Sequence, residues 1–209
     1  MATVGVVIAI VGAAVVVFGR LMLPARSRSS AGGTSEGGSG TGADSILVQL
    51  VKHYEGFSAT AKPDPLGIPT IGYGHVVVGG EPPAPWSERQ AAEILAGELV
   101  EYENMARDRW EEKTGQRWQD LTESKRAAYT SAVYNAGPTI ISSGSWPLKT
   151  NPTEAAQAFY SWSTGVSGGK RIRLAGLVRR RFTEWKLART GILDFQPAGW
   201  QAWYNQHRG

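Results

Sequence analysis

The sequence contains no cysteine, which excludes a disulfide framework and any metal site with thiolate ligands. Histidine is also scarce, and His53, His75 and His207 are too scattered along the chain for a convincing zinc site. The sequence therefore gives no reason to expect a metal or another cofactor. Large apolar side chains are present, with eight tryptophans in 209 residues, so one domain can bury a core.

The net charge of +4 is small, but it is unevenly distributed. Eleven acidic and five basic residues lie within residues 81–123, whereas ten basic and three acidic residues lie within residues 149–209. A basic C-terminal part suggests an anionic partner, for which nucleic acid and an anionic cell-wall polymer are both candidates. A solvated helix face is the simpler explanation of such a charge run.

Charge is absent from the N-terminal segment, since residues 2–19 form an uncharged run of eighteen residues. As an α-helix this run would span roughly 27 Å, close to the roughly 30 Å apolar core of a bilayer. Beyond it, residues 29–43 are rich in Gly and Ser and contain no large apolar side chain. We therefore predict a transmembrane anchor helix over residues 1–23, a flexible linker over residues 24–43 and a folded domain over residues 44–209.

A cleaved signal peptide is the alternative for this segment, because residues 29–31 (Ser-Ser-Ala) resemble a small-residue cleavage site. No Lys or Arg precedes the apolar run, however, and this favours an uncleaved anchor. The basic residues Arg20, Arg26 and Arg28 all follow the run. Taken alone, the positive-inside rule would place the remainder of the chain in the cytoplasm.

Residues that favour the start or the end of a helix divide the folded domain into a first helix and a segment that follows it. Asp44 is a favourable N-cap, and apolar residues at helical spacing follow it as far as Glu55, where Gly56 provides a stop. Residues 57–78 are rich in Gly, Pro and Thr and contain short strand-forming pieces. This pattern predicts a small hairpin sheet directly after the first helix.

Four further helices are expected after this sheet. Ser87 and Gln90 form a capping box that opens a helix up to residue 113, and Thr122 begins another that stops at Gly137. The remaining two are expected over residues 152–162 and 171–189. One small early sheet followed mainly by helices makes an α+β fold.

Two acids in the first part of the domain form a candidate catalytic pair. Glu55 lies at a helix C-terminus between Tyr54 and Phe57, where the helix macrodipole and apolar neighbours both disfavour the carboxylate anion. Asp64 follows nine residues later in a polar turn that favours the ionised form. If the hairpin folds back against the helix end, the two carboxyl groups face one gap. Glycosidic bond hydrolysis needs this pairing of a proton donor with an ionised partner that activates water or attacks the sugar.

The stretch "LVKHYEGFSATAKPDPLGIPTIGYGH" resembles the catalytic segment of phage-type lysozymes, the endolysins of glycoside hydrolase family 24. That family has an E-G pair at a helix end, an acid nine residues later, a threonine six residues beyond and then I-G-Y-G-H. Two later stretches, "SAVYNAG" and "GLVRRRFTE", resemble further blocks of the family. In the second block, one of Arg179, Arg180 and Arg181 is a candidate partner for Glu55 or Glu184, against the alternative of a solvated basic face.

The resemblance implies a lysozyme-like α+β fold and a muramidase that cuts the β-1,4 bond between N-acetylmuramic acid and N-acetylglucosamine in peptidoglycan. By this resemblance Glu55 is the general acid, while Asp64 and Thr70 hold and activate the attacking water, giving inversion. It implies no cofactor, peptidoglycan strands as the partner, no nucleic acid, and a monomeric catalytic domain. His75 is expected to have a structural hydrogen-bonding role.

The N-terminal segment resembles those of signal-arrest-release endolysins, which are tethered in the host inner membrane and freed into the periplasm on depolarisation. The basic residues after the anchor conflict with this orientation, so a lytic protein of a virion membrane remains an alternative. Two other functions also remain open. One is a membrane-tethered peptidoglycan-binding protein without turnover, and the other is a lytic transglycosylase, against which the presence of both Asp64 and Thr70 argues.

Overall fold

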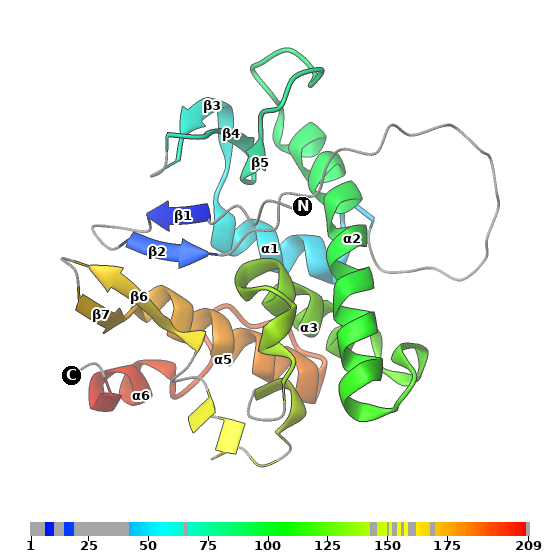
Figure 1. Cartoon of the computed structure of the whole chain (residues 1–209), viewed down its shortest axis with the longest axis vertical. Coiled ribbons are helices and arrows are strands. Elements are labelled where there is room, and N and C mark those ends of the chain that lie inside the picture. Colours follow the sequence, from blue (N-terminus) through cyan, green and yellow to red (C-terminus); the bar gives the residue numbers. More distant parts are fainter. Residues whose placement is uncertain are drawn as a thin grey trace.

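The structure is a computed structural model that describes residues 7–10, 15–18, 42–64, 67–142, 146–149, 151, 154–155, 157–158, 162–167 and 170–207. Most of the linker expected over residues 24–43 lies outside these ranges. Figure 1 shows a small sheet on one side of the chain's first long helix and a larger helical lobe on the other. The hydrophobic core lies mainly in the helical lobe.

Helix α1, Ile46–Glu55, begins the folded domain and buries one face made of Leu47, Val48, Leu50 and Val51. Its N-cap is Ser45, whose hydroxyl accepts a 3.3 Å hydrogen bond from the Val48 amide, one residue after the predicted Asp44. The extended backbone of Ser45 directs its short side chain at the free amides of the first turn. Gly56 ends the helix with a positive φ of 71°.

The predicted hairpin sheet is confirmed. It contains β3 (Ser58–Pro63), β4 (Pro69–Gly72) and β5 (His75–Val76), which pair antiparallel in chain order. The register places Ser58 opposite Gly72 and Lys62 opposite Thr70. Because β3 begins directly after the end of α1, the sheet is fixed beside the C-terminus of that helix (Figure 1).

Helices α2 (Glu88–Thr114) and α3 (Glu123–Ala136) agree closely with the sequence prediction. The Ser87 hydroxyl caps α2 by accepting from the Gln90 amide, and Thr122 caps α3 in the same way. Helix α3 is buried along most of its length and packs against α1, α2 and α5. In the described part of the chain, three short 3-10 segments lie between the helices: η1 (Trp118–Asp120), η2 (Pro138–Ile140) and η3 (Trp146–Leu148).

The C-terminal part differs from the prediction in two places. Residues 171–173, expected as the start of a helix, belong to β7 (Lys170–Arg173), which pairs with β6 (Thr164–Ser167), and α5 covers Ala175–Thr190. The β-branched residues Val166 and Ile172 favour this extended backbone. A last helix, α6 (Trp200–His207), was not predicted and packs against α5. Of the helix expected over 152–162, residues 154–155, 157–158 and 162 are described, and they are helical.

The N-terminal segment also differs from the expected transmembrane helix over residues 1–23. Its described residues form two antiparallel strands, β1 (Val7–Ile10) and β2 (Val15–Phe18). Strand β2 also pairs with β6 through Val15 and Val166, so β1, β2, β6 and β7 form a second sheet, separate from that of β3, β4 and β5. An apolar run rich in valine and isoleucine is compatible with a strand as well as with a helix. These β-branched side chains lose χ1 freedom in a helix, which raises their preference for a strand. Among the residues that the structure describes, no helix has both the length and the apolar character needed to cross a membrane.

Candidate active site

Glu55 is the last residue of α1, and its side chain is 20% exposed. Its Oε1 atom accepts a 2.7 Å hydrogen bond from Nη1 of Arg180, a residue of α5 that is distant in sequence. The environment of Glu55 is therefore not only apolar, because the guanidinium of Arg180 lies beside its carboxyl group. The last turn of α1 alone could not reveal this contact.

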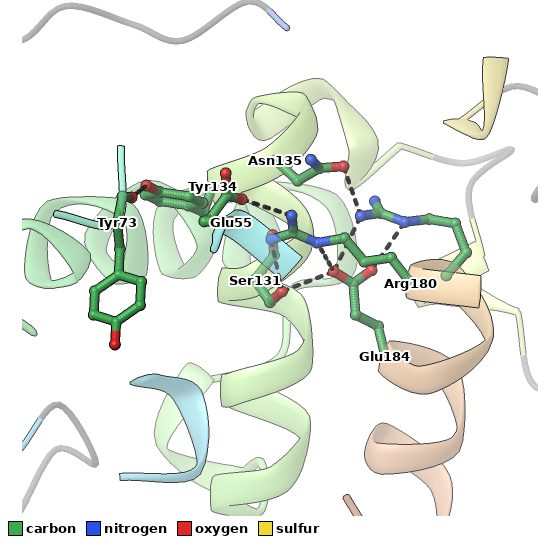
Figure 2. A network of polar contacts seen from close by, with 8 residues as sticks. Glu55, Tyr73, Ser131, Tyr134, Asn135, Arg180 and Glu184 are labelled. Atoms are coloured by element: carbon green, nitrogen blue, oxygen red, sulfur yellow. Dashed lines mark hydrogen bonds and ion pairs between the residues drawn. The ribbon is translucent and has the colours of Figure 1, made fainter. Parts of the chain in front are cut away.

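Arg180 belongs to a buried polar network between α3 and α5, which Figure 2 shows. Its side chain is 3% exposed, and its Nε donates to Oε1 of Glu184 at 3.1 Å. Its Nη2 donates to the carbonyl and hydroxyl oxygens of Ser131 at 3.4 and 3.3 Å. A buried cation requires paired partners of this kind, and the arrangement fixes the guanidinium against Glu55.

Glu184 is the acceptor at the centre of the network and is fully buried. Its Oε1 accepts from Ser131 Oγ at 2.8 Å and from Arg181 Nη2 at 3.0 Å as well as from Arg180. Arg181 also donates to Asn135 Oδ1 at 2.8 Å. The sequence prediction that one of the three arginines pairs with Glu55 or Glu184 is thus confirmed. The structure adds that Arg180 binds both carboxylates and that Arg181 also binds Glu184.

Both buried arginines remain cations at neutral pH. Burial lowers the pKa of Arg180, but the carboxylates of Glu55 and Glu184 oppose this effect and leave it above the ordinary value. Burial lowers the pKa of Arg181 to about 10, with Glu184 acting in the opposite direction. The carboxylate of Glu55 therefore faces a permanent positive charge.

Asp64 follows β3 at the turn that leads into β4. Its Oδ1 accepts a 2.8 Å hydrogen bond from the Ile68 amide, and its own amide donates to the Ile68 carbonyl at 2.8 Å. Thr70 lies on β4, where its hydroxyl donates to the Lys62 carbonyl at 3.3 Å. Since Pro63 pairs with Pro69, the register brings Asp64 and Thr70 to the same end of the hairpin. These contacts hold Asp64 and Thr70 within the hairpin, whereas the helical lobe holds Glu55.

The I-G-Y-G-H motif docks the sheet on α2. Gly72 has a positive φ of 66°, and a β-carbon there would lie 3.1 Å from Ala91 and from the ring of Trp86. His75 Nδ1 shares a 2.8 Å hydrogen bond with Glu98 Oε1, while its Nε2 lies 3.5 Å from Glu81. The hydrogen bond with Glu98 raises the pKa of His75, although burial opposes it. The predicted structural role of His75 is confirmed by these contacts.

Sequence reasoning did not identify Ser131 and Asn135 as parts of the buried network. Both lie in "SAVYNAG", a stretch that the resemblance had singled out, but as the end of a helix rather than as partners of the arginines. Among the described residues, no group of three or more His, Asp or Glu side chains is arranged to hold a metal ion.

A helix that ends in a carboxylate, a small antiparallel hairpin beside that end and a mainly helical lobe behind it together define a lysozyme-type glycoside hydrolase fold. The sequence model of the phage lysozyme family matches residues 52–184. Because this match covers more than half of the chain, the protein belongs to that family and is a glycoside hydrolase.

Solved structures agree with this assignment. The muramidase domain of SpmX from Asticaccaulis excentricus is 28% identical, with a TM-score of 0.55 over 69% of this chain and 95% of that domain. A mutant of P22 lysozyme is 25% identical, with a TM-score of 0.51 over 68% of this chain and 94% of the other. The endolysin of Escherichia coli O157:H7 phage FAHEc1 shares the fold at 23% identity, with a TM-score of 0.57 over 71% and 93% of the two chains. A search of the curated proteins finds no match.

Proposed function

We propose that this protein is an endolysin-type muramidase that hydrolyses the β-1,4 bond between N-acetylmuramic acid and N-acetylglucosamine in bacterial peptidoglycan and thereby lyses the host cell. The observation that carries the proposal is the placement of Glu55 at the end of α1, held at Oε1 by buried Arg180, directly before the hairpin that bears Asp64 and Thr70. The similarity to a muramidase domain and to phage lysozymes supports the same chemistry.

In this proposal Glu55 donates a proton to the glycosidic oxygen while Asp64 and Thr70 hold the attacking water, with inversion at the anomeric carbon. Since Arg180 binds Oε1 of Glu55, the other oxygen, Oε2, is the one that carries the transferred proton. General acid catalysis requires Glu55 to be protonated in the complex with the substrate.

The proposal is tested by incubating the full-length protein with purified peptidoglycan and measuring both binding and the release of reducing ends. A muramidase releases reducing ends with turnover. Binding to peptidoglycan without any release would instead favour a tethered or virion-associated binding protein, the main alternative from another functional class. The assay needs no added metal or cofactor under this proposal.

We also propose that the apolar N-terminal segment tethers the protein to the host inner membrane, with the catalytic domain in the periplasm and release on depolarisation. The support is the uncharged run over residues 2–19. In lipid, backbone groups must be satisfied within the segment, so a spanning helix would have to replace strands β1 and β2. Fractionation of expressing cells tests this: the protein should leave the membrane fraction only after an uncoupler is added. Recovery in the soluble fraction under both conditions would refute the tether.

A further inference from the structure

The third arginine of the basic run, Arg179, lies against the last turn of α1. Its guanidinium is 5.8 Å from the centre of the Tyr54 ring and 5.8 Å from the centre of the Trp200 ring. Tyr54 directly precedes Glu55 in the chain. Arg179 therefore places a positive charge beside Tyr54, the residue that precedes the candidate general acid Glu55.

Among the described residues, Arg179 differs from its neighbours Arg180 and Arg181 in having no acidic partner. Glu55 and Glu184 bind Arg180 and Arg181, whereas no ion pair or hydrogen bond from Arg179 is found in the described part of the chain. Its side chain is half-buried, and its Nε atom is buried with no acceptor among the residues that the structure describes. Three guanidinium groups thus face two carboxylates at this end of α5, and Arg179 carries the surplus positive charge.

The aromatic contacts hold this surplus charge in place. Trp200 is the first residue of α6, the helix that packs against α5 (Figure 1). The Tyr54 ring is itself fixed, because its hydroxyl shares a 2.8 Å hydrogen bond with Thr183 Oγ1. A guanidinium held over ring faces uses no N–H donor in those contacts, so its donors, which lie in the guanidinium plane, stay available to another partner. Burial and the charge of Arg179 also lower the pKa of His53. The positive charge of Arg179 therefore acts on the last turn of α1, where His53 lies.

We propose that Arg179 binds a carboxylate of the peptide attached to N-acetylmuramic acid and so makes the enzyme discriminate between glycan strands by the charge of their peptides. This inference rests on the proposed muramidase function. The sugars flanking the scissile bond are uncharged once the muramic acid carboxyl is linked to its peptide, so the anions of the substrate lie in that peptide. A guanidinium matches the geometry of a carboxylate with two parallel N–H donors. Arg179 is a specificity residue in this account and takes no part in proton transfer.

The test compares Arg179→Gln and Arg179→Lys with the wild type on two soluble, uncross-linked peptidoglycan preparations. One preparation carries free peptide carboxylates, and in the other these have been converted to amides with carbodiimide and ammonia. Arg117→Gln is the matched control, because Arg117 is a highly exposed arginine paired with Asp120. On free carboxylates Arg179→Gln should raise KM roughly fivefold with kcat unchanged, the effect expected of one part-exposed ion pair. On amidated strands it should match the wild type, whose own KM rises by the same factor.

Arg179→Lys keeps the charge but loses the fork of donors, so its KM on free carboxylates should lie between those of the wild type and Arg179→Gln. An equal rise in KM on both preparations would overturn the proposal, because the effect of a purely structural residue does not depend on the charge of the substrate. Unchanged KM on free carboxylates would overturn it too. If the wild type releases no reducing ends from either preparation, the muramidase function fails instead. Isothermal titration calorimetry with the two soluble strand types then still shows whether Arg179 recognises carboxylates.

Discussion

Arg180 on α5 donates a 2.7 Å hydrogen bond to Glu55 at the end of α1, across a sequence separation of 125 residues. The same guanidinium binds Glu184 and Ser131, so a single buried cation joins α1, α3 and α5. The position of the candidate general acid therefore depends on the C-terminal half of the chain as well as on its own helix.

Replacing Glu55 by Gln should abolish hydrolysis without loss of the fold. The amide still offers an oxygen to Arg180 but cannot donate the proton that a carboxylic acid supplies, and general acid catalysis contributes on the order of 10²–10⁴ in rate. The free energy of unfolding should change by no more than about 1 kcal/mol, because a hydrogen bond to Arg180 is retained. The release of reducing ends and the circular dichroism melting curve measure the two effects. Activity close to that of the wild type would remove Glu55 from its assigned role.

Replacing Glu184 by Ala should destabilise the fold strongly. This carboxylate is fully buried and pairs with two buried arginines, so its loss leaves uncompensated positive charge in the core. Breaking such a buried pair typically costs about 3–5 kcal/mol. Urea unfolding of the variant measures the loss, and Glu112→Gln, at an exposed acid of α2, serves as the control. A loss as small as that of the control would mean that the network contributes nothing to stability.

The His75–Glu98 contact should make stability depend on pH. Glu98 raises the pKa of folded His75 above its ordinary value of about 6.5. A raised folded pKa means that folding favours the protonated ring, so the contribution is complete below about pH 6.5 and is lost as pH rises through the folded pKa. Unfolding free energies measured between about pH 5 and 9 should therefore fall for the wild type relative to Glu98→Gln. Parallel profiles for the two proteins would show that Glu98 does not stabilise the charged ring.

Replacing Gly72 by Ala should destabilise the protein more than replacing Gly115 by Ala. Both glycines have a positive φ, 66° and 67°, so a side chain is strained at either position. At Gly72 the new β-carbon would also lie 3.1 Å from Ala91 and Trp86, whereas nothing lies within 4 Å of that position at Gly115. The backbone strain alone costs roughly 1–3 kcal/mol, and crowding should add to it at Gly72. Urea unfolding of the two variants gives the comparison, and equal losses would indicate that the sheet moves away from α2 at no cost.

Local signals in the sequence were sufficient where the structure depends on neighbouring residues. The Ser87 and Thr122 caps fixed the starts of α2 and α3, and the Gly- and Pro-rich stretch after Glu55 predicted the hairpin. The environment of Glu55 could not be obtained in this way, because its partner Arg180 is brought in by tertiary packing. The basic run of α5 appears as a charge pattern in the sequence, but only the fold distinguishes the two paired arginines from Arg179.

The remaining differences have similar physical origins. Residues 171–173 continue the basic run toward α5, but β-branched neighbours and pairing with β6 place them in a strand. Helix α6 has only eight residues and is stabilised by packing, for example of Trp203 on Phe182 at 5.9 Å between ring centres. The valine-rich N-terminal run suits either strand or helix, so its composition alone did not determine its structure.

The central claim, that Glu55 drives hydrolysis of the glycan strand, is tested most directly by mass spectrometry of the products formed from purified peptidoglycan in oxygen-18 water. The account predicts that the wild type produces muropeptides with one oxygen-18 atom at a new reducing N-acetylmuramic acid end, and that Glu55→Gln produces none. Products with 1,6-anhydro ends and no oxygen-18 would identify a lytic transglycosylase. That result, or an equal yield of labelled ends from Glu55→Gln, would contradict the account.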